Sequence, residues 1–246
     1  QIRENCEINN DVKKLSDLFW PGPMTIILKK KKETKICKLA SAGLDTIGVR
    51  IPNNKTALEL IRLFKKPLAA PSANTSTSLS PTEANHVYEY FKNNKNLSII
   101  LDDGSTKIGL ESTILRLVND DIQILRHGGI STEIIKENFP NKKVNDNKKS
   151  FKKVIAPGML AKHYSPTVPL RINAKKAKKN ELLIGFGPNY QSPNLSSKGD
   201  LTEAASNLFS FLAKYQKKYS KIAIAPIPNK GIGKAINDRI KRASKN

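Results

Sequence analysis

Four short segments hold arginine and hydroxyl side chains in arrangements that could bind anions. The first is Asp45–Pro52, in which Thr46, Gly48 and Arg50 alternate with apolar residues. Because side chains on a strand alternate with a period of two, these three residues share one face. Gly48 leaves space on that face, and the Arg50 guanidinium could bind a carboxylate or phosphate as a fork. An arginine that stands in solvent at a sheet edge is the alternative interpretation.

The second segment runs from the small residue Ala70 through the polar loop Pro71–Leu79 to Ser80. Ser80 could cap a following helix. Pro81 fits the first turn of such a helix, and Glu83 lies three residues after Ser80, as in a capping box. Loops at strand ends and helix N-termini both favour phosphate. Ser72 and Ser80 are therefore candidate donors to phosphate oxygens. A polar turn followed by an ordinary cap would explain the same residues.

Two shorter segments add a serine and an arginine. Ser112 lies in Glu111–Ile114, where polar residues open an apolar strand, and Arg126 lies at a strand end before a glycine turn. The sequence shows no nucleophile motif. It also shows no metal-ligand spacing among its histidines and cysteines, which are His86, His127, His163, Cys6 and Cys37. An enzyme with this residue set would work by positioning its substrates and stabilising charge.

The elements that would position these residues alternate between strands and helices, which predicts an α/β fold. The predicted strands are Met24–Leu28, Ile47–Ile51, Leu68–Ala70, Leu97–Leu101, Ser112–Leu117, Ile122–Leu125, Leu182–Phe186 and Ile222–Ala225. The predicted helices are Thr56–Phe64, Ser80 to about Asn93, Ser131–Phe139 with Ser131 as cap, Leu201–Tyr219 and Ile232–Ala243. Pro140–Ser150 is polar and rich in lysine, which predicts a linker.

The composition suits a globular protein, with 38% hydrophobic and 26% charged residues. No apolar run approaches the roughly 20 residues that cross a bilayer, and only two cysteines are present. We therefore expect a cytoplasmic protein without a membrane partner. The net charge of +22 could attract a nucleotide or tRNA. Lysines that cover a solvated surface would give the same charge.

Taken in order, the motifs resemble those of the YrdC-type L-threonylcarbamoyl-adenylate synthases. These motifs are WPGPMT (Trp20–Thr25), DTIGVRIP (Asp45–Pro52), APSANTS (Ala70–Ser76), SPT (Ser80–Thr82), ESTI (Glu111–Ile114) and LRHGGI (Leu125–Ile130). APGMLAKHYSP (Ala156–Pro166) and GIGKAINDRIKRA (Gly231–Ala243) resemble the linker and C-terminal domain of the long form. The resemblance implies a YrdC-like twisted mixed sheet with flanking helices and a small Rossmann-like C-terminal domain. The expected domains are 1–139 (catalytic, with its N-terminal part expected to be missing), 140–168 (linker or lid) and 169–246 (C-terminal).

The resemblance also implies an activity. The family joins L-threonine, bicarbonate and ATP, releases pyrophosphate, and serves the threonylcarbamoyladenosine modification of tRNA beside the anticodon. Matching the motifs puts Arg50, Ala70 and Ser112 at the threonine, and Thr46, Ser72, Ser80, Arg126 and Tyr164 at the ATP. Mg²⁺ would accompany ATP, with no residue assigned as a metal ligand or as a catalytic group. A packing tyrosine at a domain boundary is the alternative for Tyr164. Direct contact with tRNA or with the downstream threonylcarbamoyl transferase complex is left open.

The sequence departs from the family pattern at three places. Thr77 replaces a glycine that is usual after the SAN motif, and His127 replaces a proline. The basic loop that the family carries before its WPGP motif does not appear ahead of Trp20. We therefore expect that this chain by itself synthesises little product. The alternatives are an inactive fragment, a non-catalytic RNA-binding module of the same fold, and a related carbamoyl-transfer domain. An aromatic content of 6% argues against the RNA-binding module, which would stack bases on aromatic side chains.

Overall fold

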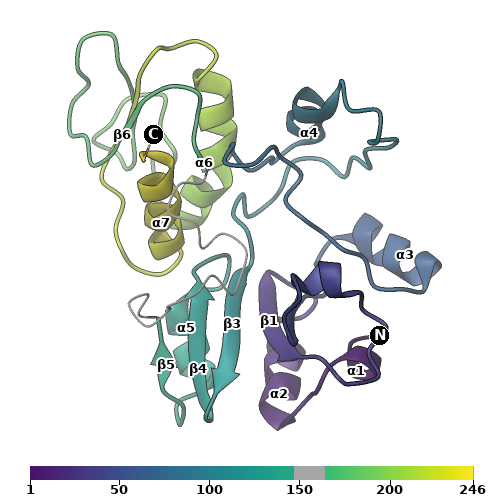
Figure 1. Cartoon of the computed structure of the whole chain (residues 1–246). Helices are drawn as coiled ribbons and strands as arrows, with labels where there is room; N and C mark the ends of the chain where they lie inside the picture. The colour runs from purple at the N-terminus through teal and green to yellow at the C-terminus, as the bar shows by residue number, and fades with distance from the viewer. Residues whose placement is uncertain (147–163, 246) are drawn as a thin grey trace. The chain divides into compact units, whose positions relative to one another are not determined.

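The structure, a computed structural model, describes residues 1–146 and 164–245 of the chain. It divides into two compact units, each of which is described by itself (Figure 1). Within the described residues, the first unit contains 1–71 and 111–146, and the second contains 72–110 and 164–245. None of the described helices is long and apolar enough to cross a membrane.

The first unit is built on a mixed five-stranded sheet with the order β2-β1-β3-β4-β5. β1 runs antiparallel to β2 and parallel to β3, and β4 runs antiparallel to β3 and parallel to β5. The strands are β1 (Met24–Lys29), β2 (Thr46–Val49), β3 (Thr113–Val118), β4 (Asp121–Arg126) and β5 (Val144–Asn145). The helices are α1 (Ile2–Asn5), α2 (Asn10–Phe19), the 3-10 helix η1 (Lys38–Ser41), α3 (Lys55–Phe64) and α5 (Thr132–Asn138). The mixed sheet with flanking helices confirms the predicted fold class.

One face of this sheet carries the hydrophobic core of the first unit. Met24, Ile26 and Leu28 of β1 are buried there, in one cluster with Leu15 of α2 and Ile135 of α5. Burying such a side chain contributes roughly 1.5–3 kcal/mol relative to leaving it exposed. Because side chains alternate along a strand, the intervening residues of β1 face the other side of the sheet.

Side-chain caps mark the starts of three helices of the first unit, α2, α3 and α5. At the start of α2, the Asn9 side chain accepts a hydrogen bond of 2.9 Å from the Val12 N–H. At the start of α5, the Ser131 hydroxyl accepts one of 3.3 Å from the Ile134 N–H, which confirms the predicted cap. Each cap satisfies a backbone donor that the helix leaves unpaired, which is worth about 1 kcal/mol.

The second unit contains a parallel three-stranded sheet with the order β6-β8-β7. Its elements are α4 (Ala84–Phe91), β6 (Leu170–Arg171), β7 (Leu182–Ile184), α6 (Leu201–Tyr215), β8 (Ile222–Ile224) and α7 (Gly233–Ala243). Phe209 and Leu212 of α6, Ile222 of β8 and Ile240 of α7 are buried in one core. The small α/β module predicted for the C-terminal part is therefore present.

Two predicted strands are wrong. Leu68–Ala70 and Leu97–Leu101 are irregular in the structure, and the side chains of Ile99 and Leu101 are 74% and 58% exposed. Neither segment pairs with a strand, and an apolar run without a partner strand has no place for its backbone hydrogen bonds. The predicted helix start at Ser80 is also wrong, because α4 begins at Ala84 after Glu83.

The described part of the lysine-rich stretch after α5, residues 140–146, contains a short strand. Val144 and Asn145 form β5 beside β4, and Val144 is buried in the core of the first unit. One apolar residue at the correct register therefore extends the sheet into a segment that composition alone predicted as linker. Residues 147–163 of the predicted linker or lid, which include His163, lie outside the described residues. The predicted domain limits 1–139, 140–168 and 169–246 stay predictions.

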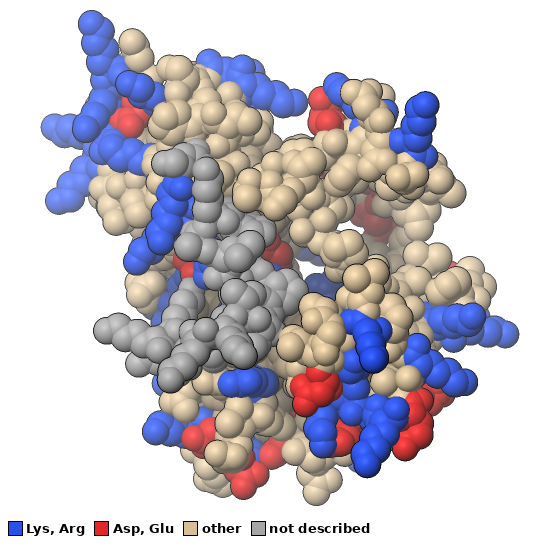
Figure 2. Space-filling model, in the orientation of Figure 1, with Lys and Arg blue, Asp and Glu red and all other residues tan. Residues whose placement is uncertain are grey.

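The positive charge is widely distributed. Figure 2 shows lysine and arginine side chains spread over the face in view, with acidic side chains among them. Several of the basic groups pair with acids, such as Lys142 with Asp11 at 2.7 Å and Lys29 with Glu7 at 3.1 Å. The Lys29–Glu7 pair is exposed, and exposed pairs contribute little to stability.

Candidate active site

Two strands of the first unit turn small or hydroxyl-bearing residues away from the core. Ile47 and Val49 of β2 pack toward the core, so Thr46 and Gly48 face the other side, as the alternation predicted. A Cβ atom placed on Gly48 would lie 3.2 Å from Thr25 Cγ2. Gly48 therefore borders Thr25 across the β1–β2 pair, at an exposed position where an added Cβ would be tightly packed.

Ser112 lies beside Thr25 at the start of β3. The two hydroxyl oxygens are 2.6 Å apart, and either hydroxyl can be the donor. Two hydroxyls carry two protons, and their mutual hydrogen bond uses only one of them. The pair therefore keeps one proton that it can donate to an acceptor on a ligand. Thr25 was not predicted as a site residue, because only the parallel pairing of β1 with β3 brings it to Ser112.

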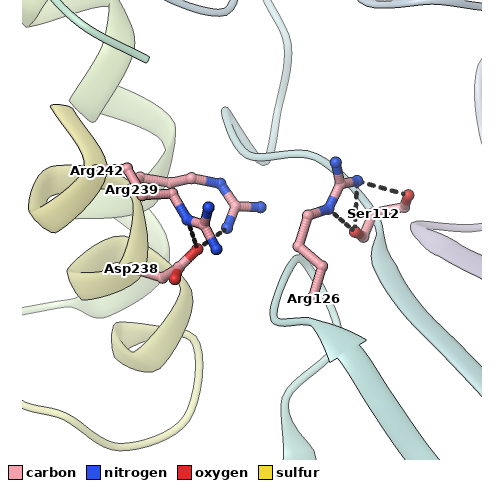
Figure 3. A network of polar contacts seen from close by, with 5 residues as sticks. All are labelled: Ser112, Arg126, Asp238, Arg239 and Arg242. Atoms are coloured by element: carbon pink, nitrogen blue, oxygen red, sulfur yellow. Dashed lines mark hydrogen bonds and ion pairs between the residues drawn. The ribbon is translucent and has the colours of Figure 1, made fainter. Parts of the chain in front are cut away.

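Arg126, at the end of β4, binds the same serine. Figure 3 shows its guanidinium directed at Ser112, and the Nη2 group donates to the Ser112 carbonyl oxygen at 2.9 Å and to its hydroxyl oxygen at 3.3 Å. Both residues are buried, with exposed fractions of 8% and 5%. The structure thus places two predicted site residues, one assigned to threonine and one to ATP, in direct contact.

A β-bulge turns Arg126 toward this face. Ile124 pairs with Leu115, whereas Arg126 pairs with Ile114, so Leu125 is an additional residue in β4. Without it, Arg126 would follow the alternation of the core residue Ile124 and face the core. Bulges of this kind redirect side chains beside functional sites. The bulge has no signal in the sequence.

The turn after β4 locks the segment that carries Ser112. A Cβ atom on Gly128 would lie 2.3 Å from the Ser112 carbonyl carbon, so only glycine allows this approach. The Thr113 hydroxyl donates to the Ile130 carbonyl oxygen at 2.6 Å, and the Ile130 N–H donates back to it at 3.0 Å. Thr46, Gly48, Thr25, Ser112 and Arg126 together form a surface from four neighbouring strands, here called the polar sheet face.

Arg50 and Ala70 belong to the same unit but lie outside its strands. Arg50 directly follows β2 and has an exposed surface, although protein atoms around its guanidinium desolvate it and lower its pKa. Arginine stays charged in proteins, so the side chain remains a cation for an anionic ligand. Ala70 is exposed in an irregular segment. The assignment of both residues to threonine stays a prediction.

Ser72 and Ser80 lie in the second unit, at the two ends of a polar loop. Ser72 is exposed, whereas Ser80 is buried and does not cap α4. Between them, Asn74 Nδ2 donates to the Ser78 carbonyl oxygen at 2.9 Å. The Asn74 Oδ1 atom is buried and has no hydrogen-bond partner in the described part of the chain. A buried acceptor without a donor is costly, so Asn74 is a candidate ligand contact that the sequence did not single out.

Tyr164 is a core residue of the second unit. It is 1% exposed, its ring centroid lies 5.6 Å from that of Phe209, and the Arg239 guanidinium carbon lies 5.1 Å from the Tyr164 ring centroid. Arg239 and Arg242 both bind the Asp238 carboxylate, at 2.9 and 3.0 Å, as Figure 3 shows. These contacts fit the alternative of a packing tyrosine, and the contact with ATP stays a prediction.

Comparison with known protein families covers nearly the whole chain. A family model described as "Telomere recombination", for Sua5, YciO and YrdC proteins, matches residues 1–128. A second model, described as "Threonylcarbamoyl-AMP synthase, C-terminal domain", matches residues 130–245. Both matches agree with the resemblance found in the motifs.

Relatives that match most of this chain give the same result. The chain is 34% identical to a threonylcarbamoyl-AMP synthase from Pyrococcus abyssi, over 97% of this chain and 75% of the relative. It is 32% identical to the enzyme of that name from Bacillus subtilis, over 94% of this chain and 72% of the relative. A crystal structure of P. abyssi Sua5 complexed with L-threonine matches with a TM-score of 0.83 and 32% identity, over 97% of this chain and 75% of that one.

Proposed function

Since the chain belongs to the threonylcarbamoyl-AMP synthase family, we propose that it makes L-threonylcarbamoyl-AMP from L-threonine, bicarbonate and ATP. Pyrophosphate is the second product, and the adenylate serves the threonylcarbamoyladenosine modification of tRNA. The relative in complex with L-threonine supports the amino acid as a substrate. ATP, bicarbonate and a link to tRNA follow from the activity named for the relatives.

The polar sheet face is the observation that carries this proposal. The reaction brings a carboxylate, a carbamate and a triphosphate together, so it needs cations and hydroxyl donors and no side-chain nucleophile. Ser112 contacts both Thr25 and Arg126, and the Thr25–Ser112 pair keeps one proton for a ligand. In our proposal, Ser112 binds L-threonine with Arg50 as the partner of its carboxylate, and Thr46 and Arg126 face ATP.

The chemistry then needs two bond-forming steps. The threonine nitrogen forms a bond to the bicarbonate carbon, and water leaves, which gives the carbamate. A carbamate oxygen next forms a bond to the α-phosphorus of ATP, and the bond from that phosphorus to the pyrophosphate oxygen breaks. Negative charge accumulates on the phosphoryl oxygens during the second step. Guanidinium groups held in place before the reaction stabilise that charge without having to reorganise.

We also propose that the other residues predicted to contact ATP do so. These are Ser72, Ser80 and Tyr164, to which we add Asn74 because of its buried, unpartnered Oδ1 atom. A Mg²⁺ ion would accompany ATP and neutralise phosphate charge, held largely by phosphate oxygens and water. The polar sheet face offers hydroxyl and guanidinium groups, which fits a nucleotide that brings its own cation. A reducing cytoplasm is the compartment that we propose, and Cys6 and Cys37 are both free thiols.

The test is an assay of the purified chain with L-threonine, bicarbonate, ATP and Mg²⁺. Pyrophosphate release should depend on both L-threonine and bicarbonate, and mass spectrometry should detect the carbamoyl-adenylate. The assay also tests the expectation that this chain by itself turns over slowly. Isothermal titration with L-threonine provides a second readout that needs no turnover. Absence of both product and L-threonine binding, together with salt-dependent RNA binding, would favour the RNA-binding alternative.

A further inference from the structure

The loop that carries Ser72 and Ser80 is built into the C-terminal module. Residues 72–110 lie between two segments of the first unit in the sequence, yet they form one compact unit with residues 164–245. Three contacts make this attachment, two near the C-terminal end of the loop and one near the end of the segment. They come from Leu79, Thr77 and Gly109.

Leu79 is the strongest of these anchors. Its side chain is 2% exposed and belongs to the same buried cluster as Tyr164 and Phe209. Every other buried member of that cluster in the described residues comes from 164–243. Leu79 immediately precedes Ser80, so the position of this candidate ATP contact depends on a side chain held in the core of the C-terminal module.

The backbone adds a second anchor two residues earlier. The Ser165 N–H donates to the Thr77 carbonyl oxygen at 2.8 Å. Thr77 has a φ of 70°, in the left-handed region that a β-branched residue rarely adopts. The loop therefore keeps an unfavourable backbone conformation at the point where it meets the start of the C-terminal module.

Gly109 fixes the other end of the segment against α6. A Cβ atom there would lie 2.4 Å from the Ala205 carbonyl oxygen and 2.6 Å from Ser206 Cα. The next residue, Leu110, packs against the core that contains Leu79. The segment is therefore attached to the C-terminal module at Gly109 and at the end of the polar loop that carries Thr77 and Leu79.

We propose that the C-terminal module positions the nucleotide-binding loop, with Leu79 and Gly109 as positioning residues. This inference rests on the proposed function for the identity of the ligand. It gives the C-terminal module a role in ATP binding that requires no contact between the module's own sheet and ATP. Loosening either anchor should therefore weaken ATP binding more than threonine binding, because Arg50 and Ser112 belong to the other unit.

The test compares three variants of the full chain. Leu79→Ala removes the anchor, Leu79→Met keeps an apolar side chain of similar volume, and Leu170→Ala removes a leucine from β6 in the same core. We expect Leu79→Ala to accelerate hydrogen exchange in residues 72–80 and to raise the KM for ATP by roughly tenfold, the equivalent of one lost contact to a charged group. The KM for L-threonine should change by less than about twofold. Leu79→Met should restore both values.

Failure of this inference differs from failure of the proposed function. If Leu79→Ala and Leu170→Ala change the exchange of residues 72–80 equally, or if both KM values rise together, the positioning role is wrong. The wild-type chain could make no product while Leu79→Ala still accelerates hydrogen exchange selectively in residues 72–80. In that case the positioning role of Leu79 is supported and the proposed activity is wrong. Should Leu79→Ala not fold, Leu79→Val provides the same comparison with a smaller cavity.

Discussion

The hydroxyl oxygens of Thr25 and Ser112 lie 2.6 Å apart and join two parallel strands of the central sheet at the surface where the site is expected. Arg126 donates to the same serine hydroxyl from the neighbouring strand β4. With two neighbours fixed on its oxygen, the Ser112 hydroxyl has a restricted orientation. This orders a donor before any ligand arrives, which is what charge stabilisation by a preorganised site requires.

The first prediction concerns Thr25. Thr25→Ala removes the partner that orients Ser112, so the KM for L-threonine should rise by roughly three- to tenfold, the equivalent of one hydrogen bond. Thr25→Ser keeps the hydroxyl and should retain wild-type affinity. Steady-state kinetics with threonine varied, and calorimetric titration, provide the measurement. Equal damage from the serine and alanine variants would mean that packing of the methyl group, and not the hydroxyl, is what matters.

The second prediction concerns Arg126. Arg126→Lys keeps the charge but loses the planar group that reaches both the carbonyl and the hydroxyl of Ser112. We expect a stability loss of about 1–3 kcal/mol, because the residue is buried, and a higher KM for ATP. Arg116→Lys on β3 is the matched control, since Arg116 is only partly buried and donates to Gln123 at 2.7 Å. An equal ATP defect in both variants would assign the effect to the sheet as a whole.

Local patterns predicted the elements that contain the site. The alternation of residues in β2 correctly predicted that Thr46 and Gly48 share one face of the sheet. Ser131 correctly predicted the start of α5. Those signals are local, because each depends on residues that are neighbours along the chain. The mixed sheet was implied by the family resemblance, and the order of its strands was not predicted.

Three parts of the site depend on distant residues and could not be predicted. Thr25 reaches Ser112 only through strand pairing, and the bulge at Leu125 decides which face Arg126 takes. Asn74 became a candidate only because its Oδ1 atom is buried without a partner in the described residues. The structure also gives a reason for the glycine that is usual in place of Thr77, since φ is positive there.

The third prediction concerns Gly128. Gly128→Ala would force the turn away from Ser112, whose carbonyl carbon lies 2.3 Å from the added Cβ. We expect a loss of roughly 1–3 kcal/mol in the free energy of unfolding, and weaker threonine binding. Gly43→Ala is the control, because φ is 77° there but nothing lies within 4 Å of an added Cβ. It should leave threonine affinity unchanged, and loss of affinity in the control would contradict the local explanation.

The fourth prediction concerns Asn74. If its buried Oδ1 atom accepts a hydrogen bond from the ligand, Asn74→Ala should raise the KM for ATP by roughly tenfold and leave that for threonine within about twofold. Asn94→Ala, on an exposed turn of the same unit, is the control. If the atom has no ligand, the ATP kinetics of Asn74→Ala should stay unchanged. Its stability would then reflect two opposing effects, deletion of an unpaired acceptor and loss of the Nδ2 hydrogen bond to the Ser78 carbonyl oxygen.

The fifth prediction concerns the pH dependence of stability in the second unit. Arg171 of β6 binds the Glu181 carboxylate, with Nε 3.0 Å from Oε1, and the Lys178 N–H donates to Oε2 at 2.9 Å. The hydrogen bond from Arg171 lowers the pKa of Glu181, and burial opposes it with a smaller effect. A pKa that is lower in the folded state stabilises the fold above the unfolded value of roughly 4.3, and this stabilisation is lost as the pH falls through the folded value.

Glu181→Gln should therefore cost stability near neutral pH, and its difference from wild type should shrink as the pH falls below about 4. Urea unfolding followed by hydrogen exchange in β7 and β8 measures this at a series of pH values. Glu89→Gln is the control, because Glu89 and Lys92 form an exposed pair on α4, and such pairs contribute little. A deficit in Glu181→Gln that stayed constant from neutral to acidic pH would show that the side chain stabilises the unit by packing, and not through its charged hydrogen bonds.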